Sequence, residues 1–184
     1  MTKFSVRLGI VPKIITVACF IIMSFALIKL TQVLLEGGFN IVYLSVIILL
    51  LISIVSPVFT MPVSIYALDD RLLLKKLLGS KTIFYSDIIV AERFSPKSDI
   101  RIFGSGGYWG FFGIFSNPRI GRYTAFVGDY KEAVLIQVAI AGGYKSYVVS
   151  CRNYDEFIML VNNNRDIRTI LSATTATANN YQNE

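Results

Sequence analysis

The side chains best suited to catalysis are scarce in this sequence and lie far apart. The chain has no histidine, which excludes histidine general bases, Ser-His-Asp and Cys-His arrangements and most zinc sites. Its two cysteines, Cys19 and Cys151, lie in different parts of the chain. They predict no disulfide framework and are typical of a protein in a reducing compartment.

The acidic residues offer no better basis for catalysis. Asp87, Glu92 and Asp99 lie nearest to a glycine-rich segment, and Asp129 follows the next expected strand. None of them has the spacing of an acid/base pair or of a set of metal ligands. The sequence therefore predicts no catalytic residue, no metal and no cofactor, and an enzyme is the least favoured interpretation.

The glycine-rich segment, residues 101–123, interleaves six glycines with aromatic residues. It differs from a phosphate-binding loop because Trp109 stands where the third glycine of the motif would be, and no Gly-Lys-Ser/Thr follows. The aromatic side chains must pack against protein or lie at a membrane interface. The candidate interface or partner contacts are Tyr108, Trp109, Phe111 and Phe112.

The remaining chemistry is that of binding through positive charge. After position 62 the chain has fourteen basic and eleven acidic residues and no long Lys/Arg run, so nucleic-acid binding has little support. Basic residues close to a membrane are attracted to anionic lipids, although solvated strand faces are the simpler explanation for each one. The candidate headgroup contacts are Arg71, Lys75, Lys76, Lys81, Arg119 and Arg122.

Two apolar runs, residues 14–35 and 39–59, are separated by little more than Glu36, Gly37 and Gly38. Each supplies the roughly 20 residues that a helix needs to cross a bilayer, so together they predict a transmembrane hairpin. Lys29 is the one charge within the runs, and its long stem can extend to the headgroups. A cleaved signal peptide is less favoured because the first run is long and a second follows at once.

The charges that flank the hairpin predict its orientation. Lys3, Arg7 and Lys13 precede the first run within a basic lead of residues 1–13, and further basic residues follow the second, whereas the connection carries only Glu36. By the positive-inside rule both termini face the cytoplasm.

The segment 63–164 is expected to form one domain made mainly of strands. Asn153 or Asp155 can begin a closing helix that ends at residues 162–164, and residues 165–184 are expected to be a flexible tail. The expected strands are residues 63–68, 71–78, 83–85, 88–94, 123–127, 133–140 and 144–150.

This arrangement resembles the bacterial pleckstrin-homology-like (PH-like) membrane proteins. The resemblance rests on Tyr66-x-x-Asp-Asp-x-Leu, on Arg101-x-Phe-Gly-Ser-Gly-Gly with the later Gly121-Arg-Tyr, and on Tyr147-Val-Val-Ser before the closing helix. It implies a membrane α-helical hairpin plus a mainly-β PH-like domain. That domain would be a bent antiparallel barrel or sandwich of about six or seven strands, capped by a C-terminal α-helix, without catalytic residues.

The combined interpretation is a binding or scaffold module at the cytoplasmic face of a bacterial inner membrane. It would bind a protein partner or anionic lipid, and no nucleic acid. The alternative is an accessory or regulatory subunit of a larger membrane transport or envelope complex. Self-association stays open, because exposed strand edges can pair between copies.

Overall fold

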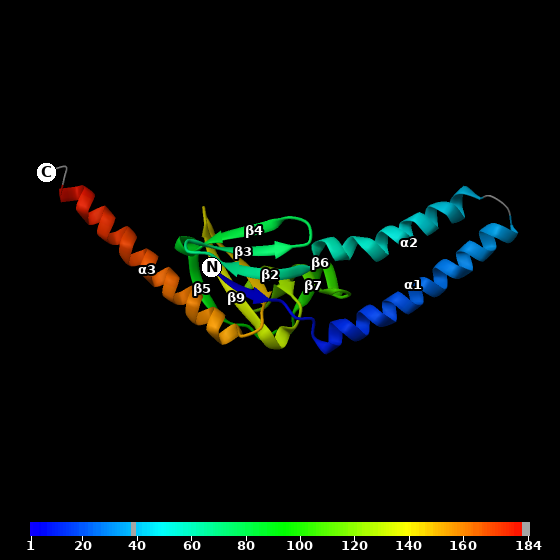
Figure 1. The fold of residues 1–184 in the computed structure, drawn as a ribbon, viewed down its shortest axis with the longest axis horizontal. Coiled ribbons are helices and arrows are strands. Elements are labelled where there is room, and N and C mark those ends of the chain that lie inside the picture. The colour runs from blue at the N-terminus through cyan, green and yellow to red at the C-terminus, as the bar shows by residue number, and fades with distance from the viewer. Residues whose placement is uncertain (38–39, 182–184) are drawn as a thin grey trace.

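The computed structural model describes residues 1–37 and 40–181, and the expected start of the second span at Phe39 lies outside them. Two apolar helices project from one side of a β domain, and a third helix leaves the other side (Figure 1). In chain order the elements are β1 (Thr2–Ser5), α1 (Ile10–Glu36), α2 (Ile41–Thr60), β2 (Pro62–Ala67), β3 (Arg71–Lys76), β4 (Ser80–Phe84), η1 (Tyr85–Asp87), β5 (Ile88–Arg93), β6 (Ile100–Gly107), β7 (Gly110–Asn117), β8 (Gly121–Val127), η2 (Tyr130–Glu132), β9 (Ala133–Ile140), β10 (Gly143–Ser150) and α3 (Tyr154–Tyr181).

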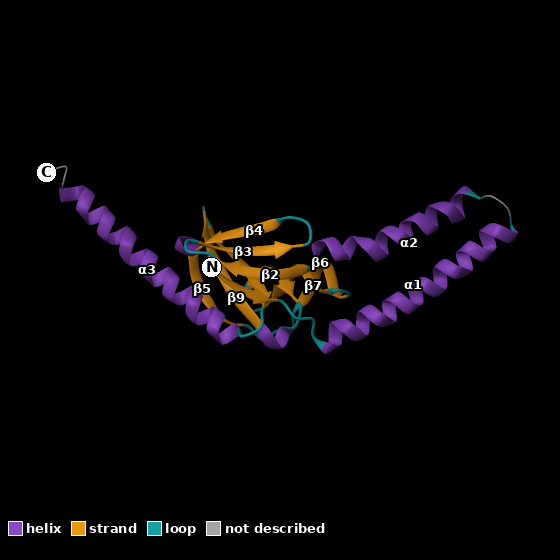
Figure 2. Ribbon diagram, viewed as in Figure 1, coloured by secondary structure: helices purple, strands orange, loops and turns teal. Residues whose placement is uncertain are grey.

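α1 and α2 lie side by side as an antiparallel helical hairpin (Figure 2). By length and composition α1 is the one described helix long and apolar enough to cross a membrane, and α2 contributes a shorter apolar stretch, Ile41–Ser56. A signal sequence near the N-terminus passes the same test. Two serines of α2 bind the helix backbone, as hydroxyls in an apolar helix commonly do: the Ser45 and Ser53 hydroxyls each donate to a carbonyl of the preceding turn, both at 2.8 Å.

The N-terminal segment is more than a basic lead. Residues Thr2–Ser5 form β1. This strand pairs antiparallel with β2, although α1 and α2 separate the two strands in the sequence. Phe4 is buried, and its ring packs edge-on against Phe157 of α3 at 5.1 Å. A strand of four residues is too short to stand out as a pattern in the sequence, and only its partner strand reveals it.

The domain consists of two sheets and is not a closed barrel, so the barrel form of the prediction is wrong for the described residues. Four strands form an antiparallel sheet in the order β1-β2-β3-β4, and six form a second sheet in the order β5-β9-β10-β8-β7-β6. Within the second sheet β8 and β10 run parallel, contrary to the expected antiparallel arrangement. The main core lies between the sheets and under α3, with Leu72, Ile136 and Phe157 among its fully buried side chains.

The glycine-rich segment forms two strands that were not expected, β6 and β7, called here the ribbon (Ile100–Asn117). Gly104 pairs with Gly113, both with positive φ, and a side chain on Gly104 would collide with the carbonyl oxygen of Phe112. Because glycine weakens an isolated strand, composition alone does not predict these strands. Here it allows two backbones to approach more closely than any other residue would permit.

The predicted end of the last helix at residues 162–164 is wrong, because α3 continues to Tyr181 and projects beyond the domain (Figure 1). Two polar side chains at that point bind the sheet instead of ending the helix. The Asn162 amide donates to the Ala91 carbonyl at 3.3 Å, and the Arg165 guanidinium donates to the Ile89 carbonyl at 2.8 Å. The helix thus occupies most of the segment expected to be a flexible tail, of which residues 182–184 lie outside the described part of the chain.

Candidate membrane-facing site

Two β-turns of the domain contact the helical hairpin near the ends that join the domain. At the β3–β4 turn, the Leu78 amide donates to the Phe59 carbonyl of α2 at 3.3 Å. At the β6–β7 turn, the Tyr108 hydroxyl donates to the Ile54 carbonyl of α2 at 3.3 Å, and the Trp109 amide donates to the Thr16 hydroxyl of α1 at 2.9 Å. These contacts define the face of the domain that lies toward the helices.

The β3–β4 turn presents two aliphatic side chains to the surface. Leu77 is 57% exposed and Leu78 is 64% exposed. Gly79 completes the turn in the left-handed region, with a φ of 79°. Two adjacent exposed leucines at the end of an apolar helix form an apolar tip that water solvates poorly.

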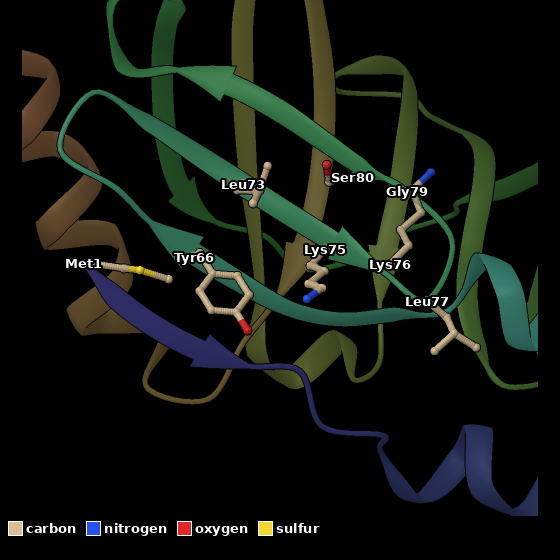
Figure 3. Close-up of a pocket in the computed structure, with 8 residues that line it drawn as sticks. All are labelled: Met1, Tyr66, Leu73, Lys75, Lys76, Leu77, Gly79 and Ser80. Carbon is tan, nitrogen blue, oxygen red and sulfur yellow. The ribbon is translucent and has the colours of Figure 1, made fainter.

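Beside this tip lies a groove of about 440 Å³ on the outer surface of the first sheet (Figure 3). It is lined by Tyr66, Lys75 and apolar side chains that include Leu73 and Leu77. The Tyr66 ring has the Lys3 ammonium at 5.8 Å and the Lys75 ammonium at 5.9 Å from its centroid. A hydrogen bond with Ser64 is the main cause that lowers the pKa of Tyr66; desolvation opposes it, and the positive charges of Lys3 and Lys75 add smaller lowering effects.

Two more lysines near the turn also rest on aromatic rings. The Lys76 ammonium lies 4.9 Å from the Phe126 ring centroid, and the Lys81 ammonium lies 5.9 Å from that of Tyr147. Lys75 and Lys76 point in different directions from β3 (Figure 3). Within the described residues none of Lys3, Lys75, Lys76 and Lys81 forms an ion pair with a carboxylate.

The three arginines predicted to contact headgroups lie elsewhere. Arg71 stands at the opposite end of β3 and forms an ion pair with Asp70 at 2.7 Å. Arg119, in the turn between β7 and β8, forms an ion pair with Glu92 at 3.0 Å. Arg122 is exposed on β8 in the second sheet. The structure therefore places the three predicted lysines, Lys75, Lys76 and Lys81, on the β3–β4 hairpin and the predicted arginines elsewhere.

The four aromatic residues predicted to contact the interface or a partner do not all lie together in the structure. Tyr108 and Trp109 bind the helices as described above, and the Trp109 indole nitrogen is buried without a hydrogen-bond partner. The Phe111 ring instead packs against Tyr130 at 4.7 Å. Phe112 lines a groove between the ribbon and α1.

Sequence reasoning used Lys3 only to orient the hairpin, and it missed both Tyr66 and Lys145. Lys3 lies against the Tyr66 ring, which lines the groove, because β1 places Lys3 directly opposite Tyr66. Lys145 lies 5.6 Å from the same Tyr147 ring that Lys81 contacts. No local pattern could have found either pair, since both depend on strand pairing across the domain.

The acidic residues near the ribbon have structural partners. Asp99 accepts hydrogen bonds from the Asn117 amide and, at 2.5 Å, from the Tyr123 hydroxyl. Asp129 accepts from the Lys131 backbone amide at 3.0 Å. Within the described chain no three histidine, cysteine or acidic side chains are grouped so that they could hold a metal ion.

The sequence profile of the family described as Bacterial PH domain matches residues 64–164. This match covers more than half of the chain, and the protein belongs to that family. The match begins within β2 and ends within α3, so it confirms the PH-like resemblance of the domain and leaves β1, α1 and α2 outside it. No curated protein and no solved structure matches the chain.

Proposed function

We propose that the protein is a non-catalytic PH-like module, anchored by α1 and α2 in a bacterial inner membrane, whose β3–β4 turn binds anionic headgroups at the cytoplasmic surface. One observation carries the proposal. Four lysines of the first sheet have no carboxylate partner within the described residues, and two of them, Lys75 and Lys76, line the groove beside the exposed leucines, where the domain meets an apolar helix.

The length of α1 supports the anchor and its depth. Its 27 residues span about 40 Å at about 1.5 Å per residue, whereas the hydrocarbon of a bilayer is about 30 Å thick. The excess of about 10 Å corresponds to the first turns, roughly residues 10–16. The Trp109 amide binds Thr16, so Tyr108 and Trp109 would lie at the interface, where such side chains are enriched.

The connectivity supports an orientation with both termini on one side. β1 precedes the helical hairpin, β2 follows it, and the two pair in one sheet. The chain must therefore enter and leave the membrane on the same side, and the basic residues there favour the cytoplasm. Removal of α1 as a signal sequence would also remove β1, and with it buried Phe4.

The lysines and leucines would act together at the surface. A lysine near an anionic surface contributes about 1 kcal/mol, and salt screens this attraction over about 10 Å at 0.1 M. The leucines add burial of apolar area, which salt does not screen. The expected result is a domain held flat against the leaflet that already contains its anchor.

The test uses the full chain in nanodiscs of phosphatidylglycerol or of phosphatidylcholine. Amide hydrogen exchange of residues 75–81 should be slower in phosphatidylglycerol, and replacement of Lys3, Lys75, Lys76 and Lys81 by glutamine should abolish the difference. Residues 68–72, around the ion-paired Arg71, serve as the internal control. Equal exchange in both lipids would exclude headgroup binding, and extraction from membranes by alkali without detergent would exclude the anchor.

The depth of the ribbon has an independent probe, because Trp109 is the only tryptophan. Bilayers with bromine atoms high on the acyl chains should quench its fluorescence more than bilayers brominated near the chain ends. Failure of both lipids to quench would place the ribbon outside the bilayer.

The exposed helix surfaces also fit the alternative function as an accessory subunit of a larger membrane complex. Side chains such as Ile21, Phe25, Leu49 and Ile52 are 57–64% exposed, and partner helices could cover them instead of lipid. Purification in mild detergent followed by mass spectrometry distinguishes the two. A stoichiometric partner would favour the alternative, and recovery of the protein alone would favour the lipid-facing anchor.

A further inference from the structure

The ribbon and α1 enclose a second groove, of about 380 Å³, at the junction of helix and domain. Ile15 and Cys19 of α1 form one wall, and both are half-buried. The other wall is formed by the ribbon, including Arg101, Gly106 and Phe112. The Trp109–Thr16 hydrogen bond lies beside it on the same face of α1, so the groove begins at the depth inferred for the interface.

Two glycines of the ribbon make this groove possible. At Gly107 an added side chain would approach the Ile15 methyl group to 2.5 Å, so the absence of a side chain allows α1 to pack on the ribbon. At Gly106 an added side chain would approach an Arg101 guanidinium nitrogen to 2.9 Å. The Arg101 guanidinium therefore packs against the Gly106 backbone, in the space that a side chain at this position would fill.

Arg101 forms no ion pair within the described residues. This distinguishes it from Arg71 and Arg119, which both bind carboxylates. An arginine beside an apolar wall lacks the anion that its planar donors fit best, a carboxylate or a phosphate. The Ser105 hydroxyl beside it is already used, since it donates to the Tyr108 carbonyl at 2.6 Å.

The lining identifies the class of ligand. Arg101 offers a cation suited to a phosphate, and Ile15, Cys19 and Phe112 offer apolar surfaces in the same groove. A soluble anion would satisfy only the arginine, and an apolar peptide would leave it unpaired. An amphipathic anion with a phosphate head and an acyl chain satisfies both the arginine and the apolar surfaces, and the leaflet beside α1 would supply it at high local concentration.

We propose that this groove holds a single anionic phospholipid, with its phosphate on the Arg101 guanidinium and one acyl chain along Ile15 and Cys19 of α1. The proposal rests on the proposed anchoring of α1 in a bilayer. It differs from the contact of the β3–β4 turn with the lipid surface, because here one lipid molecule occupies a defined site between helix and ribbon. A lipid bound there would join the domain to its anchor and set the angle between them.

The test measures lipid binding to the full chain in mild detergent by native mass spectrometry. Phosphatidylglycerol should be retained, and diacylglycerol with the same acyl chains, which lacks the phosphate, should not. Arg101→Gln should weaken retention at least tenfold. Arg119→Gln, which removes the same charge outside the groove, should leave it unchanged.

Gly106→Ala provides a second variant in case Arg101→Gln affects folding. The added methyl group meets only the far end of the flexible Arg101 side chain, so it should displace the guanidinium without unfolding the ribbon. It should weaken phosphatidylglycerol retention while thermal unfolding remains that of the wild type.

Several results would overturn the proposal. These are equal retention of both lipids, equal effects of Arg101→Gln and Arg119→Gln, competition by millimolar inorganic phosphate alone, or a co-purified polypeptide that occupies the groove. Because the chain is in detergent, failure here is separate from failure of the anchor, which is judged by extraction with alkali. A chain that resists alkali but retains no lipid would refute this site and leave the proposed function standing.

Discussion

The two β-hairpins that meet the helical hairpin do so by different means. The β3–β4 hairpin binds the end of α2 through a backbone hydrogen bond, and it carries lysines beside its exposed leucines. The ribbon lies on the helices through bare glycine backbone and binds both α1 and α2. In the proposed function the first hairpin is a surface that binds lipid, and the second is a joint that fixes the domain to the helices.

Under the proposed function, one small domain uses different hairpins for attachment to the helices and for recognition of lipid. A joint requires close approach, and glycine permits close approach at the cost of stability of the isolated strand. A lipid-facing surface requires charge without internal partners, since an ion pair with the domain's own carboxylates would compete with the headgroups. If this comparison is correct, variants at Gly104, where the two ribbon strands meet, change structure, whereas variants of the turn change only membrane affinity. Arg101 and Gly106 are the exception within the ribbon, because their proposed role is to bind a lipid.

The largest effect is expected for the strand that fastens the N-terminus to the core. Phe4→Ala removes a buried ring packed on Phe157 and should cost about 3–5 kcal/mol of unfolding free energy. Thermal unfolding of the full chain in detergent measures it, with exposed Ser5→Ala as the control on the same strand. An unchanged midpoint would mean that β1 does not belong to the folded domain.

Gly104→Ala tests the joint directly. The added methyl group meets the Phe112 carbonyl, and the backbone at φ 110° disfavours any side chain, so we expect a loss of at least about 2 kcal/mol and a red-shifted Trp109 emission. Gly142→Ala is the matched control, since its φ is 85° but no atom lies within 4 Å. Similar effects of the two variants would show that backbone strain alone, without close packing of the ribbon, explains the loss.

Asp99→Asn probes the base of the ribbon, where Asp99 joins Asn117 of β7 to Tyr123 of β8. Replacement of the charged acceptor leaves buried donors poorly satisfied and should cost about 1–3 kcal/mol. Chemical denaturation in detergent measures the loss. Lipid binding at the β3–β4 turn should not change, and a change there would contradict the separation of joint and turn.

Alkaline pH should weaken the domain through its buried phenols. Burial raises the pKa of Tyr85 and that of Tyr130 to about 12, whereas the unfolded value is 10.0. Because the unfolded chain loses these protons first, stability is complete below pH 10 and falls as pH rises toward 12. Thermal midpoints measured from pH 8 to 12 should decline above pH 10, and Tyr85→Phe should make the decline shallower.

The smallest effect distinguishes the two ends of β3. Lys75→Gln should leave unfolding unchanged and weaken the preference for phosphatidylglycerol by about 1 kcal/mol. Arg71→Gln removes the same charge from a residue paired with Asp70 and should leave that preference unchanged. The hydrogen-exchange difference at residues 75–81 measures both variants, and equal effects would show that only net charge matters.

Local pattern predicted much of the fold and little of the site. β9, expected at residues 133–140, forms over Ala133–Ile140, because its apolar residues are continuous and bounded by turns. α3 begins near the expected cap but continues past residues 162–164, where the sequence predicted its end. The Asn162 side chain donates to the Ala91 carbonyl of the sheet instead of ending the helix. The two strands of the ribbon were not predicted, because glycine is unfavourable in an isolated strand. Its glycines are required only by the close approach of the neighbouring strand and of α1, which the sequence does not reveal.

By itself the sequence determined two apolar helical segments, a mainly-β domain and the absence of histidine chemistry, because composition and short-range periodicity decide these properties. Only the tertiary structure decided which charges remain without partners. Lys3 joins Tyr66 and Lys75 through the pairing of β1 with β2, whereas Arg71 and Arg119 are neutralised by carboxylates. The physical reason is that a cation interacts with the groups nearest to it in space, and these groups often come from residues far away in the sequence.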